Sequence, residues 1–588
     1  MSDGTPGGVP DEVVDPVTGE AAPADLLAAL AAYERALAAD DLAALDDAFA
    51  PGPATLRGDG DGLLVGHRAI STFRGGRGGV APRRLARVEA RRLTQDVWLL
   101  VSVSRFAGGG SGLQTQVWAR GEDGAWRVTA AHVTGRTRAL DSSVWRTVGD
   151  PLYQGAWEGP LVGLRVAVKD LFAVKGYRVG AGNPTWLREA RRERDHAPAV
   201  LDLLRGGASL RGLARTDELA FSIAGANPHH GTPANGALPG ALPGGSSSGP
   251  ATAVATGQAD VGLATDTAGS IRVPASYQGL WGLRTTHGLV PRQGLVPLAP
   301  SFDTVGWLTR DGATLEAVVR WCLDGAVEDG AGGPGGAAGD GDDGDAGDDE
   351  GPAVGLPRRL LVPLEALALA EPDVRSAFED WLSDVADRHP EVGVDGVSVG
   401  DLGAWLEAFR AVQGAEAWRV HGAWATAHPG ALGAAVSARL AAGSQVGAEE
   451  ETAARAALAE RRSRLRALLG EDVLLVLPTT PGPAPSRSAD AATTEAVRAA
   501  TLRTTALAGV AGLPALSVPA LVVPSPLGPA PVGVCLVGAA GTDLALVRRA
   551  RLLVAGAATA GPLPPVVPEP APDAPPTTDR PAPPGGHP

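Results

Sequence analysis

The chain has 588 residues, 44% of them hydrophobic, and a formal net charge of −15 at pH 7. A chain of this length is expected to form more than one domain around a substantial buried core. The negative charge disfavours a nucleic-acid-binding protein, and the sequence has no run of about 18 apolar residues that could span a membrane.

The first residues, MSDGTPGGVPDEVVDP, contain no basic stretch followed by an apolar one, so we expect no signal peptide. The two cysteines, Cys322 and Cys535, are far apart in the sequence and form no redox or metal-binding motif. A reducing, cytoplasmic location is therefore predicted.

The first part of the chain predicts a small α+β domain over residues 24–136. Residues 1–23 are rich in glycine, proline and acidic residues and are expected to be disordered. Residues 24–50 have apolar side chains at three- and four-residue spacing, which predicts a helix. Four strand-like segments follow, with a hairpin-type GEDG loop before the last: 84–93, 96–106, 113–120 and 125–135. This order predicts a curved antiparallel sheet wrapped around the helix.

Residues 137–160 show no sustained period and are interpreted as a linker. Short apolar runs then alternate with glycine-rich loops and helical stretches, and the pattern is mostly helical from 356 to 470. This alternation of apolar runs, loops and helical stretches predicts a large α/β domain over residues 161–558. Two segments are expected to be disordered, an acidic Gly/Asp insert at 325–355 and a proline-rich tail at 559–588.

Only two lysines, Lys169 and Lys175, occur among 51 basic residues. Arginine keeps its proton in proteins, whereas a buried lysine can lose it. Lys169 ends the strand-like run LRVAVK, where burial would lower its pKa towards neutrality and suit it to be a general base. The alternatives are that Lys169 is a surface residue and that Lys175 is present by chance.

Two serine-containing turns follow Lys169, in LPGGSSSGP (242–250) and TDTAGSIRVPA (265–275). Taken alone, GSSSG matches the G-x-S-x-G elbow of α/β-hydrolases, with Ser247 at its centre. That elbow needs an acid and then a histidine after a late strand, and none of the downstream histidines is in such a place. His229 and His230 have no further ligand at metal spacing, so we expect no metal and no cofactor.

Taken together and in order, the strand-ending lysine and these two turns resemble the amidase signature family. Ser246 and Ser270 are 24 residues apart, the separation that this family shows between its two catalytic serines. The resemblance runs from about 150 to 555 and includes NPHHGTP, FDTVGW and GLPALSVP; among the branches it is most similar to the indole-acetamide-type amidases. It implies an α/β fold with a large mixed sheet flanked by helices.

The resemblance also implies roles for individual residues. Ser270 matches the nucleophile, Ser246 the bridging serine that follows a cis peptide bond, and Lys169 the base. The backbone N–H groups of Thr267, Ala268, Gly269 and Ser270 would face the developing oxyanion. Four further residues are expected to support the site, namely Gly245, Ser247, Asp266 and Arg272.

The N-terminal domain resembles the SnoaL/NTF2-like group and, within it, the AtzH-like subfamily. Such folds enclose a conical pocket between helix and sheet. The residues expected to line it are Tyr33, Arg57, Arg74, Gln116 and His132, with Arg57 as a clamp for a carboxylate. The alternative is that this domain only acts as a scaffold or forms a homodimer.

The sequence therefore predicts an amidohydrolase that cleaves a small-molecule amide through a seryl acyl-enzyme. Its expected partner is that substrate, with no nucleic acid and no membrane. Two alternatives stay open, an amidotransferase subunit that passes ammonia to a partner and a catalytically silent binding module on the same fold.

Overall fold

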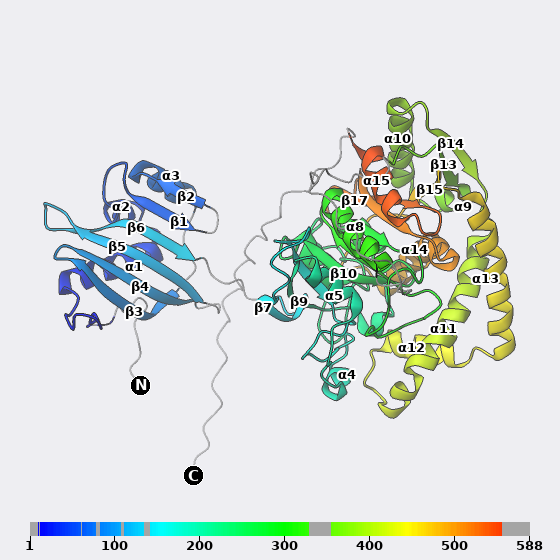
Figure 1. Cartoon of the computed structure of the whole chain (residues 1–588), viewed down its shortest axis with the longest axis horizontal. Helices are drawn as coiled ribbons and strands as arrows, with labels where there is room; N and C mark the ends of the chain where they lie inside the picture. Colours follow the sequence, from blue (N-terminus) through cyan, green and yellow to red (C-terminus); the bar gives the residue numbers. More distant parts are fainter. Residues whose placement is uncertain are drawn as a thin grey trace, which may run out of the picture. The chain divides into compact units, whose positions relative to one another are not determined.

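The computed structural model describes residue 10 and residues 12–59, 62–77, 83–106, 111–134, 141–328 and 354–555. The chain divides into two compact units, residues 1–140 and 141–588. Each unit is described by itself below, with the labels of Figure 1.

The N-terminal unit is a six-stranded sheet with helices packed on it (Figure 1). The strand order is β2-β1-β6-β5-β4-β3, and all neighbours are antiparallel except β1 and β6. The core lies between α1 and the sheet, where Leu26 and Leu30 meet Trp118 and Val128. The bounds are α1 (Ala24–Ala39), α2 (Leu42–Asp47), β1 (Leu56–Asp59), β2 (Gly62–Val65), α3 (His67–Arg77), β3 (Arg83–Thr94), β4 (Val97–Phe106), β5 (Ser111–Arg120) and β6 (Trp126–Thr134).

The four predicted strands are confirmed, but the predicted helix over 24–50 is wrong in its length. It breaks at Asp40, which is left-handed (φ 51°), and Asp41 starts α2 by accepting a hydrogen bond from the amide of Ala44 at 3.1 Å. Asp tolerates the left-handed conformation and is a favoured N-cap, so two consecutive aspartates end one helix and begin another.

The prediction that residues 1–23 are disordered is also wrong for the part of this segment that the structure describes. Val13 and Ala22 are buried, and the carboxylate of Asp15 accepts hydrogen bonds from the amides of Val17 and Arg92 at 2.8 and 2.9 Å. The segment is thus fixed to strand β3 by a buried acceptor that its acidic composition did not reveal.

The C-terminal unit contains an eleven-stranded mixed sheet with helices around it (Figure 1), which confirms the predicted fold class. The strand order is β14-β13-β15-β17-β16-β11-β12-β10-β8-β9-β7. The strands are β7 (Trp145–Tyr153), β8 (Arg165–Lys169), β9 (Ser209–Ala214), β10 (Val261–Asp266), β11 (Trp281–Arg284), β12 (Thr304–Thr309), β13 (Arg359–Pro363), β14 (Gly393–Val397), β15 (Val473–Pro478), β16 (Ala515–Val523) and β17 (Ala530–Val537). The central strands β8 and β10 are parallel neighbours that are buried along most of their length.

The helices of this unit contribute the other side chains of its hydrophobic core. They are α4 (Pro184–Glu189), α5 (Pro198–Arg205), the 3₁₀ turn η1 (Glu218–Ala220), α6 (Ser248–Ala255), α7 (Arg272–Gln278), α8 (Gly312–Glu328), α9 (Leu364–Ala368), α10 (Pro372–Arg388), α11 (Leu402–Ala427), α12 (Ala434–Ser444), α13 (Ala448–Leu468), α14 (Ala491–Ala511) and α15 (Asp543–Val554). None of the helices in the described part of the chain is long and apolar enough to cross a membrane.

The interpretation of 137–160 as a linker is wrong for its central part. Strand β7 forms an edge of the large sheet by pairing with β9. Its pairing shifts register between Trp145 and Thr147 and again between Val148 and Tyr153, so it has no clean alternation of apolar and polar residues. The helical prediction for 356–470 likewise missed β13 and β14. Residues 329–353 of the predicted insert and the whole tail 559–588 lie outside the described residues.

Candidate active site

Lys169 is the last residue of β8 and is fully buried. Its Nζ lies within hydrogen-bond distance of three hydroxyl oxygens: Ser246 Oγ at 2.9 Å, Ser247 Oγ at 2.9 Å and Thr265 Oγ1 at 2.7 Å. An ammonium can donate to all three, and a neutral amine can donate to two of them and accept from the third. The position is therefore compatible with both protonation states.

Burial lowers the pKa of Lys169 to about 7, although the carboxylates of Asp217, Asp266 and Asp303 act in the opposite direction. Removal of an ammonium from water is costly, and none of these carboxylates is hydrogen-bonded to Nζ. A substantial fraction of the side chain is thus an uncharged amine at neutral pH.

Ser246 follows a cis peptide bond from Gly245. Its carbonyl oxygen accepts hydrogen bonds from Thr216 Oγ1 at 2.9 Å and from the amide of Asp217 at 3.1 Å. A Cβ at Gly245 would lie 2.4 Å from Asp217 Oδ2 and 2.7 Å from the amide nitrogen of Gly225. Only glycine therefore fits immediately before the serine that touches Lys169.

Ser270 lies in the short loop between β10 and α7, with 3% of its surface exposed. Its carbonyl accepts a hydrogen bond from the amide of Ser247 at 3.3 Å, which holds the two serine turns together. Within the described residues the Ser270 hydroxyl forms no hydrogen bond. The structure thus brings Lys169 and Ser246 into direct contact and joins the Ser270 turn to them through the backbone.

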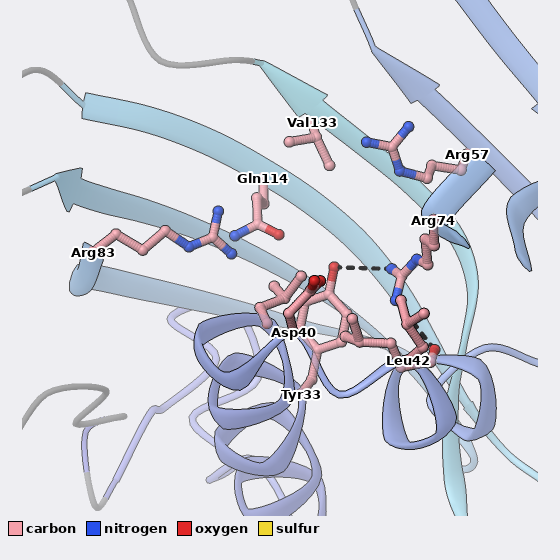
Figure 2. Close-up of a pocket in the computed structure, with 10 residues that line it drawn as sticks. Tyr33, Asp40, Leu42, Arg57, Arg74, Arg83, Gln114 and Val133 are labelled. Atoms are coloured by element: carbon pink, nitrogen blue, oxygen red, sulfur yellow. Dashed lines mark hydrogen bonds between the residues drawn. The ribbon is translucent and has the colours of Figure 1, made fainter. Parts of the chain in front are cut away.

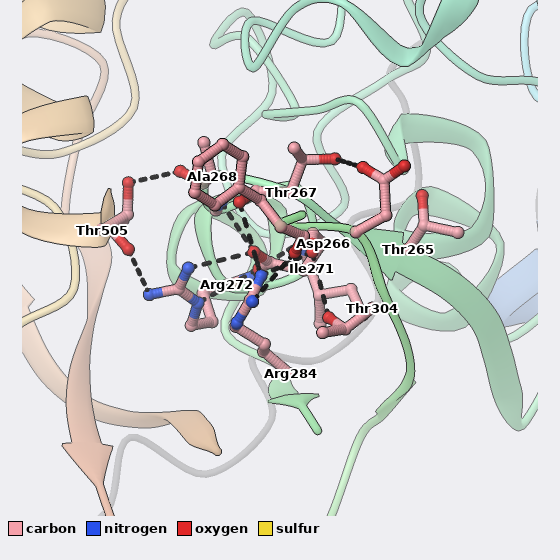
Figure 3. A network of polar contacts seen from close by, with 12 residues as sticks. Thr265, Asp266, Thr267, Ala268, Ile271, Arg272, Arg284, Thr304 and Thr505 are labelled. Carbon is pink, nitrogen blue, oxygen red and sulfur yellow. Dashed lines mark hydrogen bonds and ion pairs between the residues drawn. The ribbon is translucent and has the colours of Figure 1, made fainter. Parts of the chain in front are cut away.

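Asp266 holds the Ser270 turn by accepting hydrogen bonds from the amides of Gly269 and Ile271, and Figure 3 shows it beside Arg272 and Arg284. Both of its oxygens bind Arg272 at 3.0 Å, and Oδ1 also accepts from Arg284 Nη1 at 3.1 Å. Burial alone would raise the pKa of Asp266, but the two guanidinium groups hold it well below its usual value. The turn therefore depends on one carboxylate whose charged form is stabilised by two buried arginines, as expected for a supporting residue.

The predicted set of oxyanion donors needs one correction. The amide of Gly269 donates to Asp266 Oδ1 at 2.8 Å, so it is already engaged on the supporting side of the turn. The amides of Thr267, Ala268 and Ser270 donate to no described residue. Gly269 has a φ of +127°, and a Cβ there would lie 2.9 Å from Thr505 Oγ1, so this position requires glycine.

Sequence reasoning missed several residues that hold the site. Thr505 of α14 donates to the carbonyl of Ala268 at 2.5 Å, and Asp303 accepts from Thr267 Oγ1 at 2.6 Å. Arg284 is one of many arginines, and Thr505 is 235 positions after Ser270 in the chain. Neither residue could therefore be assigned to the site from the sequence. Thr265 directly precedes the predicted Asp266 at the end of the apolar run VGLA, so its position was a usable signal, whereas Asp217 lies in the polar stretch RTDE, far in sequence from the predicted site residues.

The alternative reading of Ser247 as a hydrolase elbow is not supported. Its hydroxyl contacts Lys169 and donates to the carbonyl of Thr265 at 3.2 Å, and it forms no hydrogen bond with a described histidine. The described residues also contain no group of three His, Cys, Asp or Glu side chains that could hold a metal ion.

The N-terminal unit has a pocket between α1, α2 and the sheet (Figure 2). Arg57 pairs with Asp59 at 2.6 Å, and Arg83 forms two hydrogen bonds with Glu34. Arg74 donates to the carbonyl of Leu45 and to the Tyr33 hydroxyl, and its guanidinium lies 4.5 Å from the centre of the Phe49 ring. The pocket is lined by Tyr33, Leu37, Asp40, Leu42, Leu45, Arg57, Arg74, Arg83, Gln114 and Val133.

Two of the five predicted lining residues are wrong. Gln116 lies deeper in the core and accepts a hydrogen bond from Trp118 Nε1 at 3.3 Å, while His132 is exposed. The pairing shifts register between Val117 and Trp118, which inserts one extra residue in β6. Such a bulge reverses the alternation beyond it, so Val133 faces the pocket and His132 faces away.

Comparison with known proteins gives matches for both units. A family model described as Amidase matches residues 149–547, and one described as AtzH-like matches residues 16–138. Amidase 1 of Oryza sativa subsp. japonica is 34% identical over 370 residues, which cover 58% of this chain and 79% of that protein. Amidase 1 of Arabidopsis thaliana is 35% identical over 356 residues, or 58% of this chain and 81% of that protein. A crystal structure of an amidase matches with a TM-score of 0.56 and 29% identity, covering 66% of this chain and 83% of the other.

Proposed function

The chain belongs to the amidase family, and on that premise we propose that it hydrolyses a small carboxamide with Ser270 as nucleophile, Ser246 as proton relay and Lys169 as base. That the chain is an amide-hydrolysing enzyme follows from the family. The observation that carries the proposed roles is the fully buried Lys169 amine, 2.9 Å from Ser246 Oγ.

In the proposed first step, Ser270 Oγ forms a bond to the amide carbonyl carbon. Its proton passes to Ser246 Oγ, whose own proton passes to Lys169 Nζ. The C–N bond then breaks, and the leaving nitrogen takes a proton back along the same route and departs as ammonia or an amine. Water attacks the acyl-enzyme, the carboxylic acid is released, and Ser270 recovers its proton.

The amides of Thr267, Ala268 and Ser270 are the proposed donors to the oxyanion that forms during both steps. They are free of other described partners, and their turn is fixed by Asp266 and Thr505. Donors that are held in place before the reaction need no reorganisation, and loss of one such donor typically costs about 10²- to 10³-fold in rate.

The isolated full-length chain should release ammonia from at least one primary amide without any partner protein. The test is a panel of short aliphatic, aryl-acetic and urea-like amides with ammonia as the readout. A subunit that transfers ammonia within a complex would need its partner for comparable turnover, and a silent binding module would release none. Either result would overturn the proposed hydrolase.

A second candidate function concerns the pocket of the N-terminal unit, for which we propose binding of a small carboxylate. The observation that favours it is the state of Arg74: Arg57 and Arg83 are paired with carboxylates, whereas none of the described carboxylates forms an ion pair with Arg74. One guanidinium in a partly apolar pocket suits a planar anion. Homodimer formation through this unit and a cytoplasmic location stay predictions.

Calorimetric titration of the full chain with malonate should show binding, and neutral malonamide should bind the N-terminal unit more weakly. An Arg74→Ala variant should weaken malonate binding about tenfold or more, because one charge-assisted pair is lost. Arg35→Ala, an exposed change on α1, is the matched control. Equal affinities for malonate in the Arg74→Ala and Arg35→Ala proteins would contradict the carboxylate site.

A further inference from the structure

The C-terminal unit has a pocket where the start of helix α11 meets the end of helix α13, and these two helices pack side by side (Figure 1). Its volume is about 360 Å³. Small-molecule sites in proteins usually have volumes of about 300–1,000 Å³. Four apolar side chains line the pocket: Val399, Trp405, Leu465 and Leu468. None of the residues proposed for catalysis lines it, so it is separate from the proposed active site.

Arg461 lines the same pocket and is an unpaired cation, because it forms no hydrogen bond and no ion pair with any described residue. Its Nη1 is buried, whereas Nε and Nη2 are not. These two nitrogens carry parallel N–H groups along one edge of the guanidinium, and such an edge matches the two oxygens of a carboxylate. Arg461 can therefore bind one carboxylate without losing an existing partner.

Two acidic side chains also line the pocket, and each of them is engaged elsewhere. Glu460 pairs with Arg464 at 2.5 Å, and Asp401 caps helix α11 by accepting a hydrogen bond from the amide of Gly403 at 2.7 Å. Together with Arg461, the pocket thus has two positive and two negative side chains. A ligand with one negative charge suits this balance, whereas Asp401 and Glu460 would repel a second negative charge.

The same two helices hold the loop that supports the proposed oxyanion donors. Glu416 of α11 accepts a hydrogen bond from the amide of Ser301 at 2.9 Å. Arg455 of α13 donates to Ser301 Oγ at 3.1 Å and to Glu416 Oε1 at 2.5 Å. Asp303 follows two residues later and accepts from Thr267 Oγ1 at 2.6 Å. The relative position of α11 and α13 therefore affects a loop that contacts the oxyanion turn.

The pocket and the Ser301 contact lie at different heights along one antiparallel helix pair. Glu416 pairs with Arg455 and Arg419 pairs with Glu451, so earlier residues of α11 lie opposite later residues of α13. Trp405 is 11 residues before Glu416, or about 16 Å along the axis of α11. Arg461 is six residues after Arg455, or about 9 Å along the axis of α13. A ligand in the pocket would thus touch both helices within a few turns of Ser301.

We propose that this pocket is an effector site for a monocarboxylate with a compact apolar body. The carboxylate pairs with the Nε–Nη2 edge of Arg461, and the apolar body packs on Trp405 and Leu465. The bound ligand joins α11 to α13, which changes how they hold Ser301 and thereby the rate of amide hydrolysis. The site goes beyond the proposed function, because it uses none of the residues to which that function assigns a role.

Amide hydrogen exchange of the full-length protein tests the site, with phenylacetate and hexanoate as probes. At least one probe should slow exchange in both 398–406 and 457–468, because the ligand contacts both segments. The neutral analogues 2-phenylethanol and 1-hexanol lack the carboxylate, and acetate lacks the apolar body, so each should protect these segments less at the same concentration. Arg461→Ala should weaken binding of the probe about tenfold or more, and Arg461→Lys should keep part of the affinity.

Arg358→Ala is the matched control, because this arginine of the same unit is 85% exposed and lies 3.8 Å from its acidic partner Asp472. It removes one positive charge outside the pocket and should bind the probe as the parent protein does. Three results would overturn the site: no protection by either probe, equal protection by the neutral analogues, and equal affinities of the Arg461→Ala and Arg358→Ala proteins for the probe.

Kinetics distinguish an effector from a ligand of the active site. The saturating probe should change the kcat of the parent enzyme for a primary amide about twofold or more, and the Arg461→Ala enzyme should lose this change. A rise in KM alone, equal in the parent and Arg461→Ala enzymes, would place the probe at the substrate site and overturn the effector role. An unchanged kcat despite protection of both helices would overturn the coupling to Ser301. Exchange is measured without turnover, so failure of the proposed catalytic roles would leave the binding result standing.

Discussion

Replacement of Ser270 by alanine should reduce ammonia release by about 10⁴-fold or more, as found when the nucleophile of a serine hydrolase is removed. The alanine cannot form the acyl-enzyme, and attack by water directly on the bound amide keeps only the help of the oxyanion donors. The turn itself should persist, because Asp266, Arg272 and Thr505 hold it without the Ser270 hydroxyl.

Two measurements check this result. Intact-mass analysis of the parent enzyme during turnover should show an added acyl group, and the Ser270→Ala protein should show none. Ser437→Ala, an exposed serine of α12, is the matched control and should retain the activity of the parent. If the Ser270→Ala protein released ammonia as fast as the parent, another group would be the nucleophile.

Replacement of Lys169 by methionine should reduce kcat/KM by about 10²- to 10⁴-fold, the usual range for loss of a general base. Methionine has a similar length and leaves no buried charge, but it cannot accept a proton from Ser246. The chain provides its own control, since Lys175 is its second lysine and is exposed. Lys175→Met should behave as the parent enzyme.

The pH profile distinguishes a base from a residue that only positions Ser246. The amine must be uncharged to act, and its pKa is about 7. The kcat/KM of the parent should therefore rise with pH up to about 7 and level off above it, and the Lys169→Met protein should lack this rise. If the Lys169→Met protein were fully active, or if its kcat/KM still rose with pH up to about 7, Lys169 would not be the base.

Stability gives an independent reading of the same pKa. Lys169 binds its proton more weakly in the folded chain than in the unfolded chain, because burial lowers its pKa from 10.5 to about 7. Between these two pH values Lys169 is protonated more often in the unfolded chain than in the folded one. The contribution of Lys169 to the free energy of unfolding therefore increases as the pH rises. The difference in stability between the parent and Lys169→Met proteins should follow this direction in denaturant titrations from pH 7 to 10.

The sequence by itself identified the segments that carry the chemistry. A strand-ending lysine in a chain with 49 arginines and only one other lysine, followed by two serine turns, is a local and ordered pattern. The mixed α/β fold of the larger unit and the strands β3 to β6 of the smaller one were likewise predictable. Apolar alternation and turn residues are properties of neighbouring residues, so they can be read without knowing the fold.

Tertiary structure alone decided how those segments are held and which of their groups are free. Asp266 takes the Gly269 amide out of the predicted oxyanion set because Arg272 and Arg284 fix its carboxylate below the turn. One extra residue in β6 turns His132 out of the pocket, and helix α14 brings Thr505 to a loop more than 230 positions earlier. Such contacts join residues that are distant in the chain, and they form only when the packed core places strands and helices side by side.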